Sequence, residues 1–235
     1  MKIYTDLVKN MKFSYPIDSE LRKHSQEYRV LATLRYLFPG KYEDMTVEDS
    51  PDLQDSINDI GIEVTIADPD NDMKAADAFS KICEGRNDQE EVNKGRIESS
   101  GYSLRPTPWG KKTISATGTS DGEKKIFQER IRKKRAKLQC YREKFKVLGL
   151  ALLLTEIPTS EAENCFVDWC HEVFQEDNNF FDFVYIISNR FCIYYEAQKN
   201  YSQKQEISSE EDCLLKTIAI MTAEGKLDLK DQEWQ

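Results

Sequence analysis

The sequence predicts an α/β fold in which helices pack against a β-sheet. Two observations support this prediction: apolar residues recur at helical spacing in several polar segments, and short runs of β-branched and aromatic residues lie between them. The chain has 235 residues, 39% hydrophobic and 32% charged, which is typical of one rather polar globular domain. Alternating helical and extended segments are what such layered folds require.

The first part of the chain is expected to contain two helices around a central strand. Residues 18–38 have apolar side chains at helical spacing and end at a Pro-Gly pair, so they predict a helix. Residues 42–47 predict a short first strand, and residues 60–67 predict the central strand, because Ile and Val alternate there. A turn with Asp and Pro then starts a helix over residues 72–83.

The middle of the chain is harder to interpret. Residues 84–120 are polar and contain seven Gly or Pro residues, so we expect a long irregular insertion with a helix only over 88–98. Residues 121–147 predict one long helix. Its apolar face is formed by Phe127, Ile131, Leu138 and Phe145.

Three further elements complete the expected domain. Residues 148–155 predict a buried strand, because they are too uniformly apolar for a sheet edge. Residues 161–175 predict an amphipathic helix, and residues 181–195 predict two strands joined as a hairpin. Cys165, Cys170 and His171 lie close together on this helix, but their amphipathic spacing favours thiols packed in the core over a zinc site.

The division into a domain and an extension follows from polarity. We expect a domain over residues 1–195 and a polar C-terminal extension over 196–235, whose helix at 210–223 either packs on the domain or recruits a protein partner. No apolar run approaches the roughly 20 residues that cross a bilayer, and the N-terminal segment lacks the apolar region of a signal peptide. We therefore expect no membrane partner and a cytoplasmic location.

The most informative segment is residues 50–67. Pro51 and Asp52 precede two short β-segments joined by a polar loop, and Glu63 is the one acid in an apolar run of the second segment. A carboxylate buried in a strand needs an ion pair, hydrogen bonds or a metal ion. The expected hairpin would carry both carboxylates, and hard cations such as Mg²⁺ bind through one or two such groups.

These residues resemble the motif of the PD-(D/E)XK nuclease superfamily, and PDLQ…GIEVT is similar to uncharacterised bacterial and phage members. The resemblance implies a restriction-endonuclease-like fold, with a four-stranded mixed central sheet flanked by helices. It also implies hydrolysis of phosphodiester bonds in nucleic acid, with Mg²⁺ or Mn²⁺ as cofactor. It implies that Asp52 and Glu63 bind the metal together with the Val64 carbonyl. Glu27 matches an acid that an upstream helix often supplies, unless it is a surface residue. Thr65 replaces the motif lysine; it can position a water molecule but supplies no positive charge.

A lysine from another element can take the place of the motif lysine. Lys134 lies on the apolar face of the helix predicted over 121–147, where an unpaired ammonium group would be costly to bury. Relatives without the motif lysine sometimes use a lysine from a neighbouring element, so the resemblance makes Lys134 the first catalytic candidate and Lys137 the second. Extension of these side chains to the solvent is the alternative.

Charge is distributed unevenly along the chain. The net charge of −9 argues against broad, nonspecific adhesion to nucleic acid. However, residues 121–146 contain eleven Lys or Arg and four Asp or Glu, whereas residues 41–72 contain eleven acids and one base. A basic helix beside an acidic pocket suits a metal-dependent phosphodiesterase, although a solvated helix face is the alternative. The expected nucleic-acid contacts are Arg130, Lys133, Lys134, Lys137 and Tyr141.

Two other functions remain open at this stage. The chain can be a catalytically inactive nuclease-fold module that binds nucleic acid or protein. It can also be a phage or bacterial interaction protein whose acidic surface mimics nucleic acid and binds a host protein. A homodimer is compatible with each of these functions.

Overall fold

The centre of the molecule is a mixed β-sheet. A computed structural model describes residues 19–67, 70–83, 89–100, 102–106, 112–116, 120–155, 158, 160–177, 180–232 and 234. Within these residues the sheet has seven strands in the order β1-β2-β3-β6-β7-β8-β9. The strands are β1 (Thr46–Val47), β2 (Leu53–Asp55), β3 (Ile60–Ile66), β6 (Val147–Leu153), β7 (Phe183–Ile187), β8 (Phe191–Glu196) and β9 (Tyr201–Glu206).

The three central strands run parallel and the outer pairs antiparallel. β3 pairs in parallel with β6, which in turn pairs in parallel with β7. β1, β2, β8 and β9 extend the sheet as antiparallel strands. The expectation of a mixed central sheet flanked by helices is thereby confirmed.

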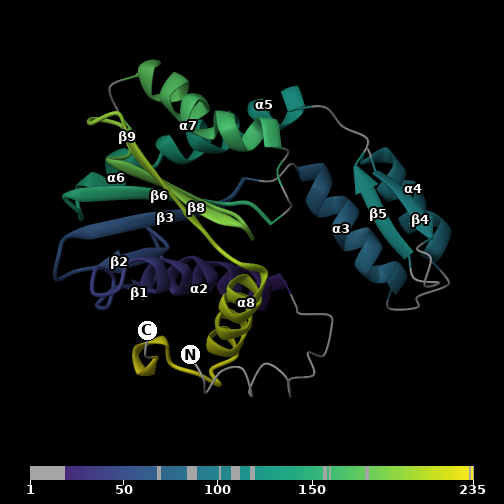
Figure 1. Ribbon diagram of the computed structural model, residues 1–235, viewed down its shortest axis with the longest axis horizontal. Coiled ribbons are helices and arrows are strands. Elements are labelled where there is room, and N and C mark those ends of the chain that lie inside the picture. Colours follow the sequence, from purple (N-terminus) through teal and green to yellow (C-terminus); the bar gives the residue numbers. More distant parts are fainter. Residues whose placement is uncertain are drawn as a thin grey trace.

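Helices cover both faces of this sheet (Figure 1). One face carries α5 (Ser120–Arg135), α6 (Leu138–Arg142) and α7 (Ser160–Gln175), and the other carries α2 (Ser19–Leu37) and α8 (Ser209–Ala223). A short 3₁₀ helix, η2 (Leu229–Asp231), follows α8. No helix in the described part of the chain combines the length and apolar character needed to span a bilayer.

The alternation of side chains divides the core into two layers. On β6, Leu150 packs in the core on the α5–α7 side, whereas Ala151 packs on the side of α2 and α8. On β3, Ile62 and Val64 belong to the core on the α2 side. Because successive strand residues point to opposite faces, Glu63 enters the layer beneath α5 and α6.

The segment between β3 and α5 forms a small lobe to one side of the sheet (Figure 1). It contains α3 (Asp70–Cys83), α4 (Glu90–Ser99) and a two-stranded antiparallel sheet of β4 (Tyr102–Pro106) and β5 (Lys112–Ala116). The expectation that 84–120 is largely irregular was wrong for this hairpin. Two residues of α3 and one of α4 form a small core on which Leu104 packs: Ala78, Ile82 and Ile97. The segment therefore has a core of its own despite its Gly and Pro content.

Two other elements differ from the expectation, and the chain after residue 195 packs on the rest of the fold. The helix predicted over 121–147 is divided into α5 and α6 by a turn in which the Lys137 amide donates to the Lys134 carbonyl at 3.0 Å. The first strand is confined to β1, because the backbone carbonyls of Tyr42, Glu43 and Met45 before it accept hydrogen bonds from Arg35 of α2. The chain after residue 195 adds β9 to the sheet and packs α8 against α2, where Arg29 and Asp212 form a buried ion pair of 2.9 Å.

Candidate functional site

Glu63, in the middle of β3, accepts hydrogen bonds from three side chains of the α5–α6 segment. Its Oε1 atom lies 2.6 Å from Lys134 Nζ and 3.1 Å from Lys137 Nζ, and its Oε2 atom lies 2.7 Å from the Tyr141 hydroxyl. We call these four residues the Glu63 network. Glu63 is only 1% exposed, so the network provides the partners that a buried carboxylate requires. Lys134, which was expected either to have a partner or to extend to the solvent, is thus paired with Glu63.

The network keeps Glu63 ionised although it is buried. Burial favours the neutral carboxyl, but hydrogen bonds from Lys134, Tyr141 and Lys137 outweigh that effect, so the pKa of Glu63 is lowered. Burial and the charge of Glu63 raise the pKa of Tyr141, and its hydroxyl therefore stays protonated as a donor. The network thus joins an ionised carboxylate and a protonated phenol to the side chains of Lys134 and Lys137.

Asp52 lies beside Glu63, just before β2. Its Oδ2 atom accepts a hydrogen bond of 2.7 Å from the Val64 amide. β2 begins at Leu53, which pairs with Ile62 of β3. The bond between Asp52 and the Val64 amide extends this pairing by one further step along β3. Asp52 is thus bound to the residue that follows Glu63, and burial together with the charge of Glu63 raises the pKa of Asp52. We call Asp52 and Glu63 the acid pair.

Glu27 lies on α2, and it is 4% exposed. Its carboxylate lies 3.0 Å from His24 Nδ1 and 3.4 Å from Lys23 Nζ, both on the preceding turn of α2. After burial and Glu63, the charge of Glu27 is a further cause that raises the pKa of Asp52. Glu27 is held by two residues of its own helix, which covers the face of the sheet opposite to Glu63.

The acid pair provides the donors for a single hard cation. Among the described residues, no three His, Cys, Asp or Glu side chains are grouped so that they could hold a metal ion. However, Mg²⁺ at phosphate-binding sites commonly takes one or two carboxylates and completes its shell with water and substrate oxygens. A cation would relieve the repulsion that contributes to the raised pKa of Asp52. The Val64 carbonyl points to the same side of β3 as its amide, which faces Asp52.

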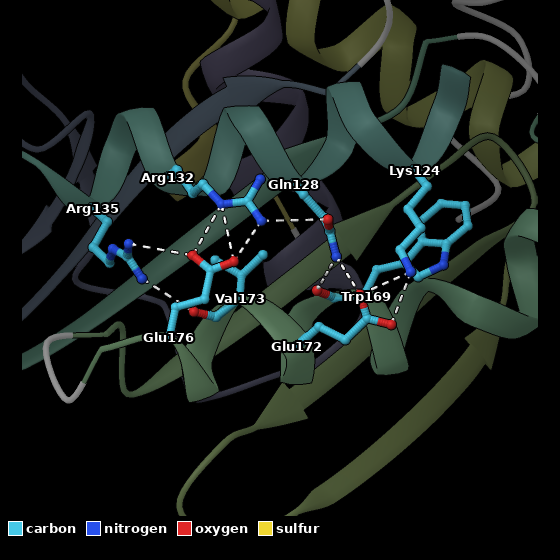
Figure 2. A network of polar contacts seen from close by, with 8 residues as sticks. All are labelled: Lys124, Gln128, Arg132, Arg135, Trp169, Glu172, Val173 and Glu176. Carbon is cyan, nitrogen blue, oxygen red and sulfur yellow. Dashed lines mark hydrogen bonds and ion pairs between the residues drawn. The ribbon is translucent and has the colours of Figure 1, made fainter. Parts of the chain in front are cut away.

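A row of polar contacts fixes α5 to α7 (Figure 2). Arg132 Nε donates to Glu176 at 3.0 Å, and Gln128 donates to Glu172 at 2.8 Å. Arg135 donates to a main-chain carbonyl of α7 at 3.1 Å. These contacts constrain both the position and the rotation of α5, and Lys134 therefore has a defined direction toward the sheet.

The same contacts reduce the positive charge that α5 presents. Several bases of the α5–α6 segment, none of them among the expected nucleic-acid contacts, are paired with acids: Lys124 with Glu172, Arg132 and Arg135 with Glu176, and Arg142 with Asp182. Lys125, Lys133 and Lys144 are exposed. The cationic surface of this segment is therefore narrower than its composition indicates.

The remaining candidate residues occupy different environments. Lys133 is exposed and Arg130 is half-buried on α5. Tyr141, expected as a nucleic-acid contact, is instead 4% exposed, and its hydroxyl is bound to Glu63. Thr65 is half-buried and follows Glu63 by two residues, so it lies on the same face of β3.

Sequence reasoning did not identify the residues that join α5 to α7. Their signal was available, since Gln128 and Arg132 are four residues apart, as are Glu172 and Glu176. The expected burial of thiols is confirmed for Cys170, which is 0% exposed in the core.

In comparisons with known proteins, no family, no curated protein and no solved structure matches this chain.

Proposed function

We propose that the chain is a metal-dependent nuclease that hydrolyses phosphodiester bonds of nucleic acid on a restriction-endonuclease-like fold. The observation that carries this proposal is the contact of 2.6 Å between Lys134 and Glu63, next to Asp52. A lysine from α5 thus reaches the motif acid in a chain that has Thr65 at the position of the motif lysine.

The acid pair and the Val64 carbonyl would hold Mg²⁺ or Mn²⁺. A cation bound there would polarise the scissile phosphate and lower the pKa of the attacking water. Lys134 would stabilise the negative charge that develops on the phosphoryl oxygens, because its ammonium group is already directed into the site. The Thr65 hydroxyl would orient a water molecule.

The substrate would be held mainly through its backbone. Lys133 is exposed next to Lys134, and the Lys137 side chain is 53% exposed at the edge of the Glu63 network. Together with Arg130 they would contact phosphate groups, which supply most of the sequence-independent affinity of such proteins.

The test is an incubation of the protein with single- and double-stranded DNA and RNA, with and without Mn²⁺. Asp52→Asn and Glu63→Gln should abolish cleavage, because each removes one negative charge while preserving the shape of the side chain. Asp59→Asn is the matched control, since Asp59 lies on the same hairpin but pairs with the exposed Lys146. Circular dichroism should show all variants folded. Cleavage retained in both active-site variants, or cleavage that does not require a metal, would refute the proposal.

One observation favours a second candidate function, a catalytically inactive module that binds nucleic acid or protein. Both oxygens of Glu63 already have partners within the chain, so the network can act purely as a structural ion cluster. Such a module should bind Mn²⁺ weakly and cleave no polynucleotide. A stable complex with a host protein, without affinity for DNA or RNA, would instead identify an interaction protein.

A further inference from the structure

The two lysines that share Glu63 Oε1 are held very differently. The Lys134 side chain is 20% exposed and lies 2.6 Å from this oxygen, on a helix that is fixed to α7 (Figure 2). The Lys137 side chain is 53% exposed, lies 3.1 Å away and belongs to the turn between α5 and α6. Lys137 can therefore leave Glu63 for solvent with little rearrangement, whereas Lys134 cannot.

The charges of the site balance only while no cation is bound. When both acids are ionised, the acid pair carries two negative charges, and Lys134 and Lys137 carry two positive charges. A divalent cation on the acid pair would leave an excess of two positive charges in a region where Glu63 is only 1% exposed. The site then requires an anion, and Glu63 can no longer hold both ammonium groups as it does without a cation.

We propose that Lys137 is bound to Glu63 until a divalent cation displaces it, and that it then contacts a substrate phosphate. A divalent cation and a phosphodiester group would therefore bind this site cooperatively. The inference rests on the proposed function and deepens it. The cation displaces Lys137 from Glu63, and this costs little because the half-exposed ammonium group regains solvent while Glu63 keeps Lys134 and Tyr141 as partners. The released ammonium group lies beside the cation and neutralises the phosphate that the cation also attracts. By linkage, the phosphate strengthens cation binding by the same factor.

The test measures Mn²⁺ binding by electron paramagnetic resonance, with and without dimethyl phosphate, the smallest phosphodiester. Sodium chloride of equal ionic strength replaces the diester in the reference sample. The wild-type protein should bind Mn²⁺ about 5- to 150-fold more tightly with the diester, which is the usual range for two coupled sites. Lys137→Gln should bind Mn²⁺ alone up to about fivefold more tightly than the wild type, because a weak competitor is removed.

The variants separate this inference from the proposed function. In Lys137→Gln the effect of the diester should disappear, whereas Lys137→Arg should retain it. Lys125→Gln, which removes an exposed lysine elsewhere on α5, should behave as the wild type. The inference is wrong if the diester strengthens Mn²⁺ binding in Lys137→Gln as much as in the wild type. It is also wrong if the diester does not change Mn²⁺ binding by a wild-type protein that cleaves nucleic acid. In both cases the proposed function stands. If the wild type neither binds Mn²⁺ nor cleaves nucleic acid, both are wrong.

Discussion

The contribution of the Glu63 network to stability can be measured with a single hydroxyl group. Tyr141→Phe removes the donor that lies 2.7 Å from Glu63 Oε2 and preserves the ring, which is packed in the core. Tyr141 is 4% exposed and Glu63 is 1% exposed, so water cannot easily replace the lost bond. A hydrogen bond to a charged group contributes about 1.5–3 kcal/mol, and we expect the free energy of unfolding to fall by about 2 kcal/mol.

Urea unfolding followed by circular dichroism measures this change, and thermal unfolding provides a second readout. For a chain of this length, about 2 kcal/mol corresponds to a decrease in Tm of roughly 4–8 °C. Tyr201→Phe is the matched control, because the Tyr201 hydroxyl lies 3.4 Å from Gln203 on a residue that is 49% exposed. Its effect should stay within about 0.5 kcal/mol. If the two variants are equally stable, the hydroxyl does not support Glu63 and the reasoning fails.

Further substitutions test the packing and the acid pair. In Gly149→Ala the new Cβ would lie 2.2 Å from a ring carbon of Phe183, so we expect a loss of about 1–3 kcal/mol in thermal unfolding. Gly95→Ala, on a helix with no atom within 4 Å of the new Cβ, should instead gain about 0.5–1 kcal/mol; a loss would contradict the described geometry. Asp52→Asn should stabilise the protein at neutral pH, because burial and Glu63 disfavour the charged form of Asp52. Folding raises the pKa of Asp52, so the wild type loses stability as the pH rises from about 4, the pKa in the unfolded chain, to the higher pKa in the folded state. The advantage of Asp52→Asn in urea unfolding should therefore grow over this interval and stay level above it. A difference that is the same below about pH 4 and at neutral pH would contradict this.

The local patterns in the sequence predicted the central strands of the fold, but not the contacts between α5 and α7 or the hairpin of the lobe. Alternation placed Ile62 and Val64 on one face of β3 and Glu63 on the other, and the structure has this arrangement. An ammonium group on an apolar helix face required a partner, which led from Lys134 to Glu63. The contacts between α5 and α7 depend on how two helices are rotated against each other, and spacing in one helix does not determine that. In the lobe the two helices were expected, but the hairpin of β4 and β5 was missed, because the small core on which it packs is assembled from several segments, each with few apolar residues.

The lobe has a consequence for how the site is assembled along the chain. β3 and β6 are parallel neighbours, so the chain must cross over between them, and the lobe is built into this crossover. Glu63 and Lys134 are 71 positions apart for that reason, although their side chains touch. A protease cut inside the lobe would leave both carboxylates on one fragment and both lysines on the other, and the site would then exist only while the two fragments stay associated.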